Sequence, residues 1–275
     1  IILQLAFIGL FIAQMAHQLI TAKQRNNYPI LLVLSLLALC QSLTLIGLAM
    51  GDDDLQRRGA LAALWLIAVM LSLIGGRVIP FFTQRGLGRV EAFAAHPWLD
   101  RLLLACGVLV AALFASGHNL HANPWLATPF LVLSVLHGLR LWRWYLPGIW
   151  RVPLLWSLHL AYTWLLVASL GMAAWHLGWL AQPSLASHAL AVGAMGGLIL
   201  AMMARVSLGH TGRALQPPHS MAWAFGLLNL GALIRVSAGS GWLWLAALCW
   251  AVAFALFAWH YAPMLCRARV DGHPG

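Results

Sequence analysis

Three histidines and two arginines lie in or beside long apolar stretches, where their side chains could bind a metal or an anion. They are His159, His188, His210, Arg77 and Arg205. Imidazole nitrogen is a common ligand of haem iron and of copper. A guanidinium group can hold a haem propionate or another anion through paired hydrogen bonds. These residue types favour a redox or binding protein.

The same side chains also have plainer interpretations, which the sequence leaves open. His188 could bond to interfacial water or to a neighbouring helix, because it lies about one turn inside an apolar segment. His159 shares a helical face with Tyr162, so it could be a packed hydrogen-bond donor instead of a ligand. Arg77 and Arg205 could anchor the ends of membrane helices through their long side chains.

His210 lies in the segment Ser207–Arg213 (SLGHTGR). Its two glycines permit backbone conformations closed to other residues and would let the imidazole approach a ligand closely. His188 precedes His210 by 22 residues, which corresponds to about 33 Å along a helix. The two histidines therefore cannot share one metal.

The stretch between these histidines is long and apolar enough to cross the hydrocarbon core of about 30 Å as a helix. Small residues recur at every fourth position along it, at Ala189, Gly193, Gly197 and Ala201. Such a ridge lets neighbouring backbones approach closely inside a membrane. We expect this helix to contact at least two others through the ridge.

Nine apolar segments of this kind divide the chain. The sequence is 62% hydrophobic and only 8% charged, whereas soluble domains are about 25% charged. The segments lie near 1–20, 29–50, 60–80, 99–117, 125–141, 152–177, 185–207, 220–238 and 242–265. The sequence predicts an all-α fold, a polytopic transmembrane helix bundle that forms a single transmembrane domain over residues 1–275.

Basic residues are distributed unequally between the two sides of this bundle. Alternate connections hold 13 and 3 of the 16 Lys and Arg residues. Cytoplasmic loops carry the excess of positive charge, so the pattern predicts a cytoplasmic C-terminus and an Ile1 on the outer side. Because the charges lie singly between apolar runs, the net charge of +10 reflects membrane topology and not nucleic-acid binding.

Two absences narrow the chemistry further. The six carboxylates lie in the predicted connections, which weakens a transporter coupled to ions through a membrane Asp or Glu. The four cysteines form no C-x-x-C-H motif, so any haem would be bound non-covalently. The sequence opens at Ile1 inside an apolar run without a signal-peptide pattern, and we expect the chain to be truncated at its N-terminus.

Four segments together carry a family likeness. They are Gly75–Thr83 (GGRVIPFFT), Pro153–Leu160 (PLLWSLHL), His188–Ala194 (HALAVGA) and Arg205–Arg213 (RVSLGHTGR). In this order and spacing they resemble segments of the NnrS family of bacterial inner-membrane proteins, and the likeness runs over nearly the whole chain. The resemblance implies a twelve-helix protein with haem and copper, linked to denitrification and to the response to nitric oxide.

The resemblance also implies that His159, His188 and His210 are motif histidines. The family's Trp-His-x-His-Glu segment would lie upstream of Ile1, at the depth of His188. We therefore expect His188 to be a metal or haem ligand, or to donate directly to one, and His159 to lie in a different layer of the protein. By this interpretation the chain carries the last nine helices of the family.

Three functions remain open at this point. The first is a haem- and copper-binding membrane protein that limits nitrosative damage, with the lipid bilayer and nitric oxide as its partners. The second is a membrane oxidoreductase that acts on a nitrogen oxide at the haem. The third is a transporter of a small molecule or a metal complex. The sequence favours the first and leans against an enzyme.

Overall fold

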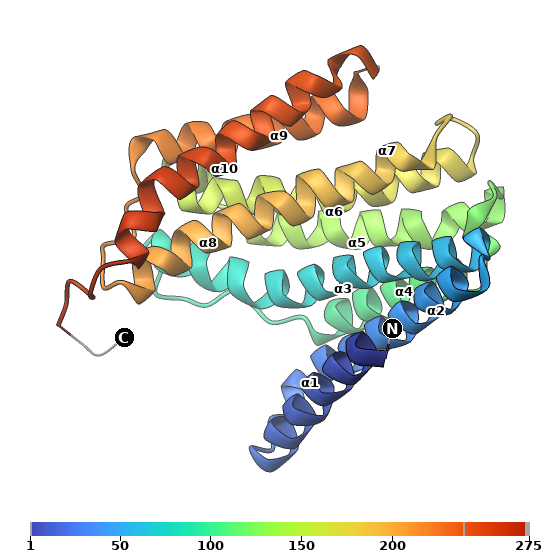
Figure 1. The fold of residues 1–275 in the computed structure, drawn as a ribbon. Helices are drawn as coiled ribbons and strands as arrows, with labels where there is room; N and C mark the ends of the chain where they lie inside the picture. Colours follow the sequence, from blue (N-terminus) through green and yellow to red (C-terminus); the bar gives the residue numbers. More distant parts are fainter. Residues whose placement is uncertain (1, 239, 273–275) are drawn as a thin grey trace. The chain divides into compact units, whose positions relative to one another are not determined.

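A computed structural model describes residues 2–238 and 240–272 of the chain. Ile1, where the first predicted segment begins, lies outside the described residues, as do residues 273–275. The described residues form helices joined by short connections (Figure 1). The helices are α1 (Ile2–Thr21), α2 (Tyr28–Met50), α3 (Asp53–Gly86), α4 (Pro97–Ala115), α5 (Ala127–Trp144), α6 (Pro153–His176), α7 (Pro183–His188), α8 (Gly196–His210), α9 (His219–Ser237) and α10 (Leu243–Leu265).

Nine helical spans in this part of the chain are long and apolar enough to cross a membrane, which confirms the predicted all-helical, multi-pass fold. One span, Pro183–His210, consists of α7, a π-helical segment (Ala189–Met195) and α8. Most bounds agree with the predicted segments within a few residues. The predicted segment 60–80 is too short, because α3 continues into polar residues at both ends.

Local sequence signals explain where several helices begin and end. Proline occupies an early position in α2, α4, α6 and α7, where its missing N–H costs no intrahelical hydrogen bond. Gly51 follows α2 with a φ of 68°, a conformation that glycine adopts without strain. The Asp52 carboxylate then accepts a hydrogen bond from the Leu55 backbone N–H at the start of α3.

The chain divides into two compact units, and the division falls within α3, α5 and α6. Unit 1 consists of Ile1–Ile74, His96–Leu136 and Ala173–Ala181, and unit 2 of Gly75–Ala95, His137–Met172 and Gln182–Gly275. The single transmembrane domain stays a prediction.

Close backbone packing and an aromatic cluster hold unit 1 together. Gly47 and Gly59 bring α2 against the first turns of α3, and Gly107 brings α4 against Val69 of α3. Trp65 stacks on Phe114 and meets the edge of Phe130, and the His176 ring stacks on Phe130. Because these rings come from α3, α4, α5 and α6, they fix the mutual packing of the helices in this unit.

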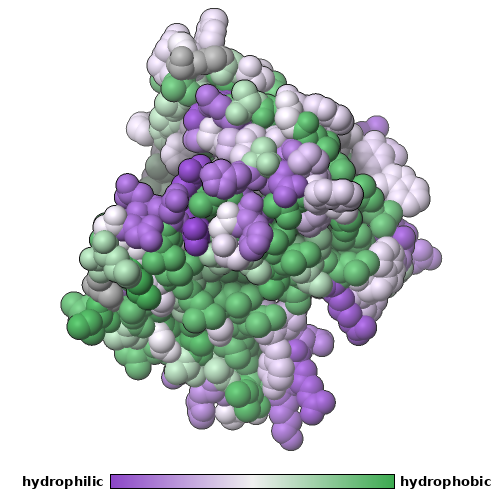
Figure 2. All heavy atoms as spheres, turned by 90° about the vertical axis from the view of Figure 1, so that its right-hand side faces the viewer, coloured by the Kyte–Doolittle hydropathy of each residue, from purple (hydrophilic) through white to green (hydrophobic). Residues whose placement is uncertain are grey.

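Large hydrophobic side chains also cover much of the outside of the protein. Leu10 of α1 is 73% exposed and Val135 of α5 is 69% exposed, and Figure 2 shows hydrophobic residues over a large part of the face that it draws. A soluble monomer rarely exposes apolar patches larger than a few hundred Å². Together with the nine spans, this surface identifies a multi-pass membrane protein whose helices face lipid.

Candidate cofactor site

His159 is the candidate ligand with the most suitable surroundings. It is buried on α6, and its Nδ1 lies 2.9 Å from the Leu155 carbonyl oxygen one turn earlier. Because a carbonyl oxygen only accepts hydrogen bonds, Nδ1 carries the proton of the neutral ring and Nε2 carries the lone pair. Nε2 is buried without a hydrogen-bond partner among the described residues. The backbone carbonyl of Trp144, at the end of α5, is a second acceptor near the ring and offers Nε2 no donor.

A buried imidazole lone pair that faces no donor suits a metal ligand. The Leu155 carbonyl fixes the tautomer and the orientation of the ring, as outer-shell acceptors do for metal-bound histidines. Since a single histidine can bind haem iron, His159 would suit a haem ligand. For copper, the described residues contain no group of three or more His, Cys, Asp or Glu side chains placed to hold a metal ion.

A buried polar cluster lies one helical turn along α6 from His159. Tyr162 is fully buried, and its hydroxyl accepts a hydrogen bond from Arg140 Nη1 at 3.0 Å. The same hydroxyl is hydrogen-bonded to His137 Nδ1, also at 3.0 Å. The Arg140 guanidinium lies 5.7 Å from the Trp144 ring centroid. The cluster therefore places a cation inside unit 2, close to the candidate ligand.

Two adjacent glycines of α3 make room for this cluster. A Cβ atom at Gly76 would lie 2.9 Å from Arg140 Nη1, and one at Gly75 would lie 3.2 Å from the Tyr162 ring. Both contacts are too close for a larger residue without rearrangement. The glycine pair of the segment Gly75–Thr83 therefore lets Arg140 and Tyr162 pack against the α3 backbone.

Arg140 and His137 are not among the residues that the sequence predicts for the site, although it predicts Tyr162 on the same helical face as His159. A signal was present, since His137 and Arg140 are three residues apart and share one face of α5. The signal was weak, because only the folded chain brings α3, α5 and α6 together at this point.

His188 has different surroundings, although its ring has the same tautomer. Its Nδ1 lies 2.6 Å from the Ser184 carbonyl oxygen, and its Nε2 lies 2.8 Å from Arg235 Nη2. A guanidinium only donates, so the lone pair on His188 Nε2 accepts this hydrogen bond. Arg235 thus occupies the atom that would bind a metal. The prediction that His188 is a ligand stays a prediction, and this contact does not favour it.

His210 is exposed at the end of α8. The segment after it is ordered by contacts with the C-terminal part of the chain, because the Val270 backbone N–H donates to the Thr211 carbonyl oxygen. Asp271 pairs with Arg269 at 2.6 Å and lies against Gly212, which has a φ of 71°. The glycine next to His210 thus accommodates the tail of the protein, and no described contact joins His210 to a second candidate ligand.

The two predicted anion-binding arginines differ in burial. Arg205 is buried on α8, and its guanidinium lies 3.9 Å from the Phe82 ring centroid, so the cation rests on an aromatic face. Arg77 is exposed on α3. The role of Arg77 and Arg205 as an anion clamp stays a prediction.

The predicted ridge of small residues is buried, and it sets how α6 packs against the α7–α8 span. Gly193 lies against the Trp164 ring, and a Cβ atom at Gly197 would lie 2.8 Å from Ala161 of α6 and 3.5 Å from Leu228 of α9. The expectation that the ridge contacts at least two other helices is therefore confirmed. The other two ridge residues, Ala189 and Ala201, are also buried.

The same packing separates the three motif histidines. Ala186 lies opposite Gly171, and Gly197 lies opposite Ala161, so His159 is level with a point about halfway between His188 and His210. At about 1.5 Å per residue, His159 is about 16 Å along the helix axis from either of the other two histidines. The expectation of different layers is confirmed, and no two of the three can bind one metal ion.

Comparison with known proteins identifies the family of this chain. The chain matches the model of the NnrS protein family over residues 1–269. No curated protein and no solved structure matches the chain. Since the family match covers nearly all of the sequence, including every segment described above, this multi-pass membrane protein belongs to the NnrS family.

Proposed function

We propose that this protein binds haem non-covalently, together with copper, and limits nitrosative damage by binding nitric oxide. Family membership supports the metals, because the NnrS family is generally associated with haem and copper. The single observation that carries the proposal is the buried lone pair on His159 Nε2. We place the protein in the bacterial cytoplasmic membrane with its C-terminus in the cytoplasm, as the distribution of basic residues suggests.

In this proposal His159 would hold the haem iron through its Nε2. The Leu155 carbonyl holds the ring in the tautomer that leaves Nε2 open. The cation of Arg140, held by Tyr162, lies one helical turn away and favours a negative charge nearby, which suits a carboxylate such as a haem propionate. When bound, haem iron supplies the position that takes nitric oxide.

The other candidate residues have secondary roles in this proposal. Arg205 and Arg77 are second choices for holding an anionic group. His188 is available to a metal only when Arg235 releases its Nε2. His210 is available at the surface end of α8. The proposed activity is binding of nitric oxide without turnover.

The test compares haem content in the full-length protein purified from membranes. His159→Ala should lose most of the Soret absorbance, and added imidazole should restore part of it by occupying the vacated position. His118→Ala is the matched control, because His118 lies on the connection between α4 and α5, where its Nδ1 is hydrogen-bonded to the Ser116 hydroxyl at 2.8 Å. Thermal unfolding of each variant separates loss of haem from loss of fold.

Three outcomes would change the proposal. Full retention of haem in His159→Ala would exclude His159 as the ligand. Loss of haem only in His188→Ala would move the site to α7. Steady consumption of nitric oxide by the wild-type protein with an electron donor, in place of stoichiometric binding, would favour the oxidoreductase.

A further inference from the structure

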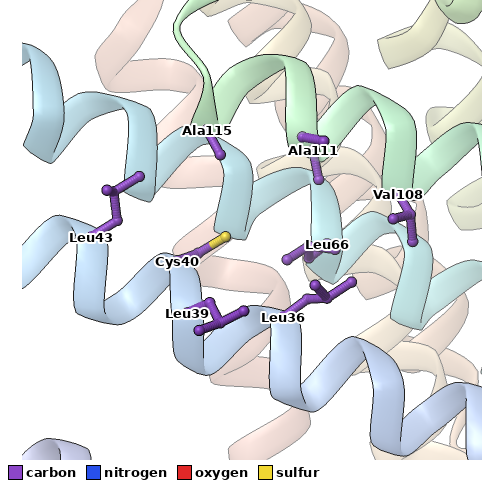
Figure 3. A pocket seen from close by; sticks show the side chains of 9 residues that line it. Leu36, Leu39, Cys40, Leu43, Leu66, Val108, Ala111 and Ala115 are labelled. Atoms are coloured by element: carbon purple, nitrogen blue, oxygen red, sulfur yellow. The ribbon is translucent and has the colours of Figure 1, made fainter.

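Unit 1 contains an apolar hollow between α2 and α4, with Leu66 of α3 at its floor. Its volume is about 360 Å³. Figure 3 shows side chains from the three helices around it, among them Leu39 and Cys40 of α2 and Ala111 and Ala115 of α4. Apart from the Cys40 thiol, every lining side chain is aliphatic. None of the residues proposed for haem binding takes part.

The hollow follows from the way the three helices pack. Gly59 brings the α2 backbone close to α3, and Gly107 does the same for α4. The two outer helices are therefore drawn onto α3, while the residues that α4 turns toward α2 are small. Ala111 and Ala115 are one helical turn apart and leave space that leucine side chains would fill. The gap is thus a property of the sequence of α4.

The position of the hollow determines what can occupy it. Leu36, Leu39, Cys40 and Leu43 lie in the middle of α2, a helix that spans Tyr28–Met50, so the hollow lies at the depth of the hydrocarbon core. Leu39 is 65% exposed, which shows that the hollow opens to the surface of unit 1. The aliphatic lining offers water no hydrogen-bond partner. At that depth the surrounding medium is lipid tails.

We propose that this hollow is a binding site for a single acyl chain of a membrane phospholipid. A helix with its side chains is about 10–12 Å across, so the space suits part of one acyl chain and not a helix. The aliphatic lining offers no hydrogen bond, which excludes a polar ligand or a headgroup at this depth. The acyl chain covers the Cys40 thiol and completes the contact between α2 and α4.

The test uses the wild-type protein in vesicles of phosphatidylethanolamine and phosphatidylglycerol. A fraction of the phosphatidylethanolamine carries a diazirine in the middle of one acyl chain, and light converts it into a carbene that inserts into nearby C–H bonds. Mass spectrometry of the peptides then locates the adducts. We expect several-fold more adducts on Leu36–Leu43 and Val108–Ala115 than on Leu131, Val132 and Val135, which are exposed on α5 in the same unit.

Two variants extend the test. Ala115→Phe fills the hollow and should remove the excess of adducts, whereas Val135→Phe enlarges an exposed side chain outside the hollow and should leave it. If Ala115→Phe does not accumulate, Cys40 supplies a second measurement: its alkylation by N-ethylmaleimide in detergent should slow several-fold when phospholipid is added.

An even distribution of adducts along the exposed helices would overturn the proposal. So would adducts that Ala115→Phe leaves unchanged. A cross-link from Cys40 to a second copy of the chain or to another protein segment in vesicles would show that protein, and not lipid, occupies the hollow.

Discussion

His159 and His188 carry the same Nδ1–H tautomer, yet their Nε2 atoms meet different surroundings. His159 Nε2 is buried and faces no donor, whereas His188 Nε2 accepts a hydrogen bond from Arg235. At the scale of the residue, a histidine side chain is not sufficient for metal binding. Whether the imidazole can bind a metal depends on the group that faces its lone pair.

The contact between Arg235 and His188 should contribute measurably to stability. Arg235→Met keeps most of the side-chain volume and removes the donor. A hydrogen bond to a charged group is worth about 1.5–3 kcal/mol, and because this pair is partly exposed we expect about 1 kcal/mol. Since each kcal/mol shifts Tm by about 2–4 °C in a chain of 150–250 residues, the expected fall is a few degrees.

Thermal unfolding in detergent measures this effect. Arg267→Met, at an exposed position beyond α10, is the control and should leave Tm unchanged. An equal fall in both variants would show that loss of a surface charge, and not the contact with His188, is responsible.

At the scale of the element, the α7–α8 span depends on glycine where it meets α6. The π-helical segment Ala189–Met195 contains Gly193, whose Cα faces the Trp164 ring. That ring is fixed in turn, because Trp164 Nε1 donates to the Asn229 side chain at 2.9 Å. A π-helical turn within an α-helix is uncommon and is found frequently at functional sites.

Gly193→Ala should therefore destabilise the protein. The new methyl group would overlap with a ring that cannot move freely, and overpacking of this kind costs about 1–3 kcal/mol. Gly226→Ala on α9 is the matched control, because no atom lies within 4 Å of its added Cβ. Alanine is a better helix former than glycine by about 1 kcal/mol, so the control should be neutral or slightly more stable.

Chemical or thermal unfolding of the two alanine variants measures the difference in their stability. Equal stability of Gly193→Ala and Gly226→Ala would mean that Trp164 adapts to the methyl group. The close approach of α6 and the π-helical segment would then contribute little to the fold.

At the scale of the whole molecule, the membrane orientation is the property with the widest consequences. The 13 basic residues in one set of connections against 3 in the other predict that the end of α8 lies in the cytoplasm and the start of α7 outside. Gly209 and Gln182 are exposed at these two ends of the span Pro183–His210. They therefore report the two sides of the membrane.

Gly209→Cys and Gln182→Cys, each combined with Cys266→Ser, should label differently in intact cells stripped of their outer membrane. A membrane-impermeant maleimide should modify the cysteine at position 182 and leave the one at 209 until the membrane is opened. Labelling of position 209 before the membrane is opened would show that the protein has the opposite orientation.

Several features could be predicted from the sequence because each depends on neighbours in the chain. Helical spans follow from runs of apolar residues, and the ridge of α7–α8 follows from a four-residue period of small residues. The family likeness follows from short strings such as Gly75–Thr83. The bounds of α3 could not be predicted in the same way, because a helix continues past its apolar part when its polar ends reach water.

The tertiary structure decided which of the candidate side chains surround a possible site. His188 meets Arg235, 47 residues away, and Trp164 meets Asn229, 65 residues away. Arg140 donates to Tyr162 of α6, and its guanidinium packs against Gly76 of α3. Such contacts depend on the register between packed helices, and a shift of one residue turns a helical side chain by about 100°. Local sequence therefore determined the membrane helices and the family, whereas helix packing determined that His159, among the motif histidines, has a buried Nε2 without a hydrogen-bond partner in the described residues.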